Sequence, residues 1–202
     1  MINMVLVLKP WRCFTGEEVI HFRPGVNLIV GDQGSGKSSL FQAIQLRGMS
    51  TPASWKLPPK DEVPVMIDWQ GDPVPVFAFD FEHDSYRTKP FFEGDFPFHL
   101  NAMHSSHGEM VVAMFDKLEE TKLADMPMFV LVDEPDMALS IRSCLRLVRI
   151  FKRVAELGGQ VIATAHNPIL IGGFEEVYSI EHGEWMTSQK YMNTQVEEPK
   201  NG

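Results

Sequence analysis

Residues 26–44 read VNLIVGDQGSGKSSLFQAI. It contains GDQGSGKS (31–38), a complete match to the pattern G-x-x-x-x-G-K-[ST]. An apolar strand precedes the match, and apolar residues at helical spacing follow it. A strand that passes through glycines into a helix directs backbone N–H groups and the helix N-terminus at an anion. The stretch therefore predicts a phosphate-binding loop of the P-loop type in an α/β fold.

The residue types in this loop suit a nucleoside triphosphate with magnesium. Lys37 offers a mobile positive charge to the β- and γ-phosphates, and the Ser38 hydroxyl is a ligand for Mg²⁺. The alternative interpretation is a glycine-rich turn with an incidental lysine. We expect ATP to be held by the whole loop and the first residues of its helix, namely Gly31, Asp32, Gln33, Gly34, Ser35, Gly36, Lys37, Ser38 and Ser39.

A second motif, FVLVDE at 129–134, supplies two carboxylates after an apolar strand. Parallel strands end at one edge of a sheet, so Asp133 is expected beside the phosphate loop, where it would hold Mg²⁺ directly or through water. Glu134 follows at once and points in a different direction, which suits a general base for water attacking the γ-phosphate. The alternative is an acid that only stabilises the start of the next helix.

His166 follows the apolar run QVIATA at 160–165. If this run is a neighbouring parallel strand, His166 lies near Asp133 and the γ-phosphate. A histidine satisfied within the core is the alternative. We interpret Lys37, Glu134 and His166 as the catalytic group.

Length and composition agree with one folded domain. The chain has 202 residues and a formal charge of −9, which disfavours coating of nucleic acid or anionic lipid by net charge alone. Only Cys13 and Cys144 are present, so neither a disulfide framework nor a thiolate zinc site is supported. The sequence has no apolar run of 18 residues and no secretory signal, so we expect a cytoplasmic protein with no membrane segment.

The remaining pattern predicts an α/β domain over residues 1–186 and a polar, flexible tail over 187–202. The expected elements are strands at 4–8, 18–22 and 26–30, a hairpin at 63–81 around Gly71-Asp72-Pro73, a helix from Gly108, a buried strand at 128–132, a helix at 139–157 and a buried strand at 160–165. Strand, helix and strand in the last third indicate a right-handed crossover with parallel strands at the centre of the sheet.

Four segments together resemble an ATP-binding cassette (ABC) ATPase: GDQGSGKS, SSHGE (105–109), VDEPDMALS (132–140) and ATAHNPIL (163–170). More narrowly, they resemble the soluble, non-transporter SMC, RecF and OLD group and small bacterial and phage predicted ATPases. The resemblance implies an ABC ATPase head with a parallel core sheet, N-terminal antiparallel strands and a shortened helical lobe at about 85–125. It also implies that Arg12 lies close to the nucleotide.

In such proteins SSHGE is the signature motif and acts on a second subunit. The resemblance implies that Ser106 and the Gly108 backbone reach the γ-phosphate held by the partner, so that two nucleotides lie between two copies in a head-to-tail homodimer. A helix opening at Gly108 is physically suited to face an anion. Residues 136–139 would form the loop that crosses this interface.

The resemblance fails at one position. A cassette ATPase has a Gln that contacts magnesium and water before the helical lobe, yet residues 71–129 contain none. We expect Glu82 or Asp80 to replace it as a metal ligand. Only about 70 residues separate Ser38 from Ser106, so a coiled-coil arm is excluded.

Two further signals remain open. His104 and His107 have a spacing that could begin a zinc site, although the signature interpretation is preferred. Four arginines repeat at helical spacing and could contact nucleic acid or a protein partner, or form a solvated face: Arg142, Arg146, Arg149 and Arg153. The functional alternatives to an ATP-driven switch in DNA-related or phage–host processes are an ATP-gated binding module with little turnover and a small-molecule kinase.

Overall fold

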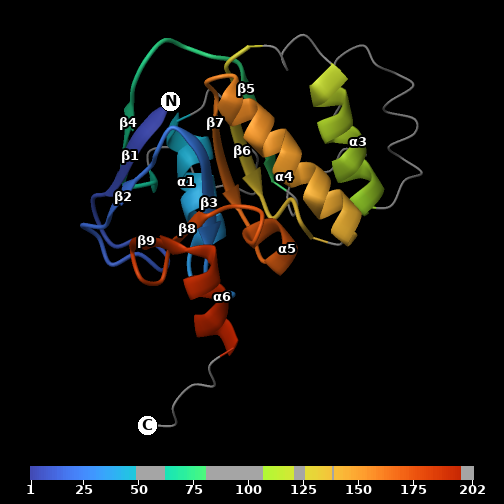
Figure 1. Ribbon diagram of the computed structural model, residues 1–202. Coiled ribbons are helices and arrows are strands. Elements are labelled where there is room, and N and C mark those ends of the chain that lie inside the picture. The colour runs from blue at the N-terminus through green and yellow to red at the C-terminus, as the bar shows by residue number, and fades with distance from the viewer. Residues whose placement is uncertain (49–61, 81–106, 121–125, 138, 197–202) are drawn as a thin grey trace.

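The computed structural model describes residues 1–48, 62–80, 107–120, 126–137 and 139–196. Within these ranges the chain forms an α/β structure with two sheets and helices on both faces of the larger one (Figure 1). The α/β class predicted from the sequence is confirmed.

The larger sheet has six strands in the order β5-β6-β7-β3-β8-β9. The first five run parallel, and β9 is antiparallel to β8. The strands are β3 (Gly25–Val30), β5 (Val76–Asp80), β6 (Phe129–Asp133), β7 (Gln160–Thr164), β8 (Glu176–Ser179) and β9 (Glu184–Thr187). The central strands are continuous apolar runs because helices or a second sheet cover both faces.

Alternate residues of the central strands enter two different cores. In β6, Phe129 and Leu131 pack with α1 (Lys37–Gly48) and the smaller sheet, whereas Val130 and Val132 pack with the opposite helices. Those helices are α3 (His107–Glu120) and α4 (Ile141–Glu156), which lie side by side on that face (Figure 1). This division follows from the two-residue period of a strand.

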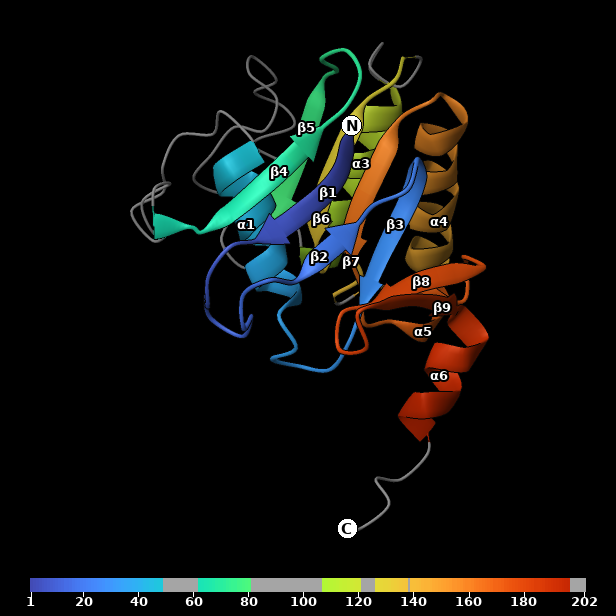
Figure 2. The same cartoon turned by 90° about the vertical axis from the view of Figure 1, so that its left-hand side faces the viewer.

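A smaller antiparallel sheet lies across the α1 side of the molecule (Figure 2). It contains β2, β1 and β4 in that order, namely β1 (Ile2–Val7), β2 (Val19–His21) and β4 (Val65–Trp69). A buried amide joins the two sheets: Gln160 at the start of β7 donates to Ile2 O at 2.7 Å and accepts from Ile2 N at 2.8 Å.

The predicted hairpin at 63–81 is wrong. β4 pairs with β1 in the small sheet, whereas β5 pairs in parallel with β6 in the large sheet. Pro64 and Pro75 each precede the first residue of a strand, where a missing N–H does not interrupt the ladder. The local pattern therefore fitted both strands but did not reveal their partners.

The helix predicted at 139–157 is α4, and its boundaries have clear causes. Ser140 is the N-cap, because its Oγ accepts the Ser143 backbone N–H at 3.2 Å. Gly158, at φ 79°, ends the helix with an N–H bond to Ala155 O. Five apolar residues of α4 and Cys144 form its buried face: Leu147, Val148, Ile150, Phe151 and Val154.

Part of the segment expected to be a flexible tail is helical. Within the expected tail, α6 (Ser188–Val196) follows β9. A short helix before the tail, α5 (Pro168–Ile171), follows β7. Ser188 and Tyr191 of α6 are buried. The rest of the expected tail, 197–202, lies outside the described residues, as does most of the helical lobe expected at about 85–125.

Among the helices in the described ranges, none is both long and apolar enough to cross a membrane.

Candidate functional site

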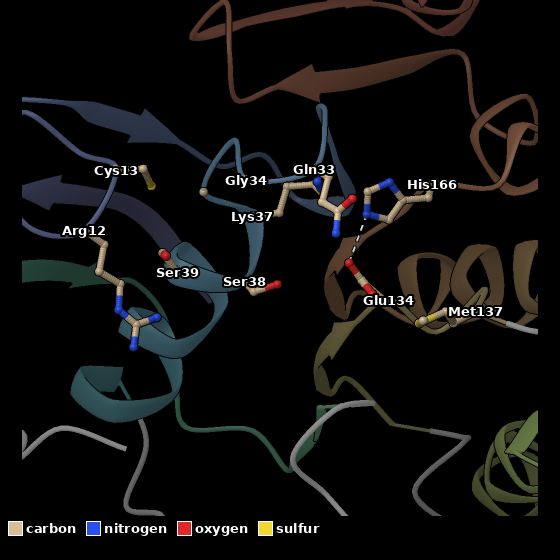
Figure 3. A pocket seen from close by; sticks show the side chains of 11 residues that line it. Arg12, Cys13, Gln33, Gly34, Lys37, Ser38, Ser39, Glu134, Met137 and His166 are labelled. Atoms are coloured by element: carbon tan, nitrogen blue, oxygen red, sulfur yellow. Dashed lines mark hydrogen bonds and ion pairs between the residues drawn. The ribbon is translucent and has the colours of Figure 1, made fainter. Parts of the chain in front are cut away.

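A cavity of about 720 Å³ opens at the carboxyl ends of the central parallel strands. Arg12, Cys13 and Ser39 lie toward one end of it, Glu134, Met137 and His166 toward the other, and Lys37 and Ser38 between (Figure 3). Gln33, Gly34 and Gly36 complete the lining. The cavity therefore gathers motifs that are far apart in the sequence.

The glycines shape the loop between β3 and α1. Gly34 and Gly36 have φ values of 83° and 108°, in the region that only glycine adopts without strain. A Cβ atom at Gly36 would also lie 2.5 Å from Cys13 Sγ, so the exposed Cys13 side chain would have to turn aside. The loop thus needs glycine at these positions for its backbone conformation.

Lys37 is the buried cation of the site. Its Nζ donates to Gly31 O at 2.9 Å and to Asp32 O at 2.8 Å, so the loop carbonyls hold the ammonium. Burial lowers the pKa of Lys37, while the negative charges of Glu134 and Asp133 oppose that shift. The lysine is thus kept near two carboxylates by bonds within its own loop.

Glu134 has an unusual backbone conformation, with φ at 47°. A positive φ is rare outside glycine and is tolerated where surrounding contacts hold it. Here the Glu134 N–H donates to Thr164 Oγ1 at 2.8 Å, and Thr164 donates in turn to Asp133 Oδ1 at 2.5 Å. Thr164, at the end of β7, therefore fixes both acids of the DE pair.

His166 faces Glu134 across the end of the sheet. His166 Nε2 and Glu134 Oε1 are 2.9 Å apart, as the dashed line in Figure 3 marks. The backbone N–H groups of His166 and Asn167 both donate to Asp136 Oδ2, at 2.8 and 2.5 Å. The predicted base and the predicted phosphate-contacting histidine are thus direct neighbours.

Arg12 is held at the outer end of the cavity. Its Nη1 donates to Gln42 Oε1 at 2.6 Å, and its guanidinium lies 4.7 Å from the centre of the Trp11 ring. Like Glu134, Arg12 has a positive φ, of 54°. The resemblance placed Arg12 close to the nucleotide, and the structure places it in the same cavity as Lys37.

The C-terminal part of the chain supports the base of the phosphate loop. Glu181, in the turn between β8 and β9, accepts the Asp32 N–H at 2.6 Å. Tyr191 of α6 is buried, and Glu181, Asp32 and the Gly31 backbone are its electrostatic neighbours. Burial, together with the charges of Glu181 and Asp32, raises the pKa of Tyr191 to about 12.

Most of the predicted nucleotide residues line the cavity, but some do not. Gly31, Asp32 and Ser35 belong to the loop without facing the cavity, and Asp133 is buried behind it. Gly108 lies at the start of α3 and lines a separate groove between α3 and α4. Glu82 and Ser106 are outside the described residues. The same holds for the side chains of His104 and His107, whose spacing suggested a zinc site.

Magnesium has a suitable but small set of protein ligands. In the described part of the chain, no three His, Cys, Asp or Glu side chains gather closely enough to hold a metal ion. Mg²⁺ commonly uses only one or two protein groups, with phosphate and water as the others. The Ser38 hydroxyl and the Asp133 carboxylate fit that pattern, and Asp80 is the register neighbour of Asp133 on β5.

The sequence reasoning missed several residues that build the site. Cys13 and Met137 line the cavity, and Thr164, Gln42 and Glu181 hold its functional residues in place. Thr164 could have been found, because it ends the strand beside Asp133. The others are brought in by contacts between distant parts of the chain.

Comparison with known proteins identifies a matching segment and similar folds. The AAA domain family matches residues 6–48, which include β3 and the phosphate loop. A nucleotide-free ATP-binding cassette from an ABC transporter superposes with a TM-score of 0.57, at 14% identity, over 99% of this chain and 97% of that one. This chain has the fold of an ATP-binding cassette.

Two other solved structures have similar folds. An Smc head bound to the C-winged helix domain of ScpA matches with a TM-score of 0.55, at 14% identity, over 95% of this chain and 99% of that one. The dimeric, post-hydrolysis state of a cassette bound to ADP and Pi matches with a TM-score of 0.51, at 13% identity, over 93% and 99%. The cassette fold is therefore shared by proteins with different assemblies.

Proposed function

We propose that this cassette-fold protein binds Mg-ATP and hydrolyses it. One observation carries the proposal: Glu134 and His166, paired at 2.9 Å, share a single cavity with Lys37 and Ser38. A cation and loop amides for phosphate thus lie beside a carboxylate that can orient water. The AAA domain match over residues 6–48 and the cassette fold both support this assignment.

Each residue has a distinct expected role. The loop amides and Lys37 bind the phosphates, which requires Lys37 Nζ to exchange its bonds to Gly31 O and Asp32 O for phosphate oxygens. Ser38 and Asp133 would hold Mg²⁺, which neutralises phosphate charge when bound. Glu134 orients the attacking water, and His166 donates to the γ-phosphate.

A nucleotide-sandwich homodimer is part of the proposal. Gly108 does not line the cavity that contains Lys37, so the signature segment would act on the nucleotide of a second copy. One structure with the same fold is a dimer bound to ADP and Pi, which supports this arrangement. Met137 lines the cavity and is 50% exposed, as expected of a residue that a partner covers.

The test is the substitution Glu134→Gln. We expect it to leave ATP binding intact, to abolish turnover and to accumulate a dimer measurable by light scattering. The control is Glu184→Gln, a similar change at an exposed residue of β9. A Glu134→Gln protein that stays monomeric with saturating Mg-ATP would show that the sandwich mechanism is wrong.

A second candidate function is an ATP-gated module that binds a macromolecule and uses little turnover. It is favoured by the arginines of α4: Arg142, Arg146 and Arg149 line a groove of about 490 Å³ between α4 and α3. Arg146 is paired with Asp116 at 2.5 Å and Arg153 with Glu156 at 3.9 Å, whereas Arg142 and Arg149 are exposed on the same helix. Nucleic acid or an acidic protein segment are the expected partners.

Turnover with and without a DNA duplex tests this second function. Several-fold stimulation by DNA, lost in an Arg142→Glu/Arg149→Glu variant, would support a nucleic-acid clamp. Stimulation that survives both substitutions would exclude the α4 arginines as the contact.

A further inference from the structure

Asp136 lies beside the proposed catalytic pair without facing the nucleotide cavity. It is 5% exposed and sits in the loop between β6 and α4, two residues after Glu134. One of its oxygens, Oδ2, accepts the backbone N–H groups of both His166 and Asn167. Hydrogen bonds to a carboxylate are charge-assisted and stronger than those between neutral groups.

These bonds fix the turn that carries His166. β7 ends at Thr164, and α5 begins at Pro168, so only three residues connect them. The Asn167 side chain caps α5 by accepting the Ile169 N–H at 2.9 Å, while the backbone N–H groups of 166 and 167 are directed at Asp136. Asp136 and the cap of α5 therefore fix the backbone of this turn, and in this conformation the His166 ring is directed at Glu134.

The link is reciprocal between the two strand ends. Thr164, from the end of β7, donates to Asp133 and accepts from Glu134 N–H. Asp136, from the loop after β6, accepts from the backbone that follows β7. The two strand ends therefore hold each other through one hydroxyl and one carboxylate, with Glu134 and His166 between them.

Folding alone does not explain why residue 136 is an aspartate rather than an asparagine. Asp136 Oδ1 is buried and has no hydrogen-bond partner among the described residues. A buried carboxylate with an unpartnered oxygen is costly compared with a neutral amide of the same shape. An asparagine would fill the same space and could still accept from both N–H groups, with weaker bonds.

From these contacts we propose that Asp136 is a positioning residue, whose carboxylate orients His166 toward Glu134 and links the loop that would meet a partner subunit to the catalytic pair. The role in turnover rests on the proposed ATPase function. The orientation of His166 does not, because it is a property of the chain without nucleotide.

The experiment compares wild type with Asp136→Asn and Asp136→Ala. Asp68→Asn is the control, because Asp68 also accepts a side-chain bond, from Asn3 Nδ2 at 2.8 Å, in the small sheet far from the site. The first readout is the ¹⁵N NMR signal of the His166 ring, assigned with a His166→Gln variant. We expect this signal to move in both Asp136 variants and to stay in place in Asp68→Asn.

The second readout is steady-state ATP hydrolysis. We expect kcat to fall roughly 10–100-fold in Asp136→Ala, as for other residues that orient a functional side chain, and by less in Asp136→Asn, with KM within about twofold of wild type. Asp136→Asn should keep most of the wild-type stability, so a fall in kcat larger than the fall in melting temperature would separate a positioning role from a merely structural one.

Two results would overturn the proposal: unchanged His166 ring signals in both Asp136 variants, or a rise in KM with kcat unchanged. Absence of ATP hydrolysis in the wild type would instead refute the proposed function, and the NMR readout would still test the orientation of His166.

Discussion

Thr164 Oγ1 donates to Asp133 Oδ1 at 2.5 Å and accepts the Glu134 N–H at 2.8 Å. One buried hydroxyl from β7 thus supports two consecutive acids after β6, one proposed to hold the metal and one proposed to orient water. The positive φ of Glu134 depends on this bond, because it gives the strained residue a partner for its N–H.

Removing the hydroxyl should weaken the fold as well as turnover. Thr164→Val keeps the shape but leaves the part-buried Glu134 N–H without its acceptor and the buried Asp133 carboxylate without its donor, which costs about 1–3 kcal/mol. Urea unfolding at neutral pH measures the loss. Thr164→Ser is the control and should stay closer to wild type; equal stabilities for the valine and serine variants would contradict the assigned role.

Cys13 offers a chemical probe of nucleotide binding. It is exposed and lines the cavity, whereas Cys144 is fully buried, and burial raises the pKa of the Cys144 thiol. We expect iodoacetamide to modify Cys13 first and Mg-ATP to slow that reaction, as followed by mass spectrometry. In Lys37→Ala the protection should disappear. Equal rates with and without Mg-ATP in wild type would argue against nucleotide in this cavity.

The negative charge of Glu181 should weaken the affinity of the site for ATP. Its carboxylate accepts the Asp32 N–H and acts on Lys37, so it adds negative potential at a site meant for phosphate. Glu181→Gln keeps an acceptor and removes the charge, and should tighten ATP binding by about twofold to fivefold at low salt, the size of a screened surface interaction. Titration calorimetry measures the change in ATP affinity, and Glu184→Gln is the control. Weaker binding would mean that the charge holds the loop rather than opposing the ligand.

The stability of the fold should depend on pH in the alkaline range because of Tyr191. Its pKa in the folded state is raised to about 12, above the ordinary value of 10.0, so its stabilisation is complete below pH 10 and is lost as pH rises through about 12. Tyr191→Phe should lower the melting temperature at pH 7 and reduce its further fall between pH 9 and 11.5. An unchanged pH dependence in this variant would show that Tyr191 does not titrate with unfolding.

The sequence predicted the parts of the site that depend on local rules. Lys37 and Ser38 came from a motif whose backbone geometry is fixed by its glycines. The placement of His166 near Asp133 followed from the rule that neighbouring parallel strands end at one edge, whereas its pairing with Glu134 was seen only in the structure. Both expectations needed only short stretches and one statement about sheet topology.

The parts that were missed depend on contacts between distant residues. β4 and β5 both alternate in a way that suits a hairpin, but their partners are β1 and β6, which no local pattern specifies. Asp136 and Thr164 are common residues at strand and helix ends, so their roles emerge only when two strand ends are placed together. Helix α6 was missed because its sequence is polar, although Tyr191 anchors it in the core.

The Gln160 amide also has a consequence for how the molecule comes apart. Its side chain makes three hydrogen bonds, two to the Ile2 backbone and one to Arg23 O at 3.0 Å. The bonds to Ile2 connect β7 of the large sheet to β1 of the small sheet. α1 packs in the same core between them. Neither layer can detach without breaking a buried polar contact, so denaturation should proceed as a single cooperative transition that every spectroscopic probe reports at the same midpoint.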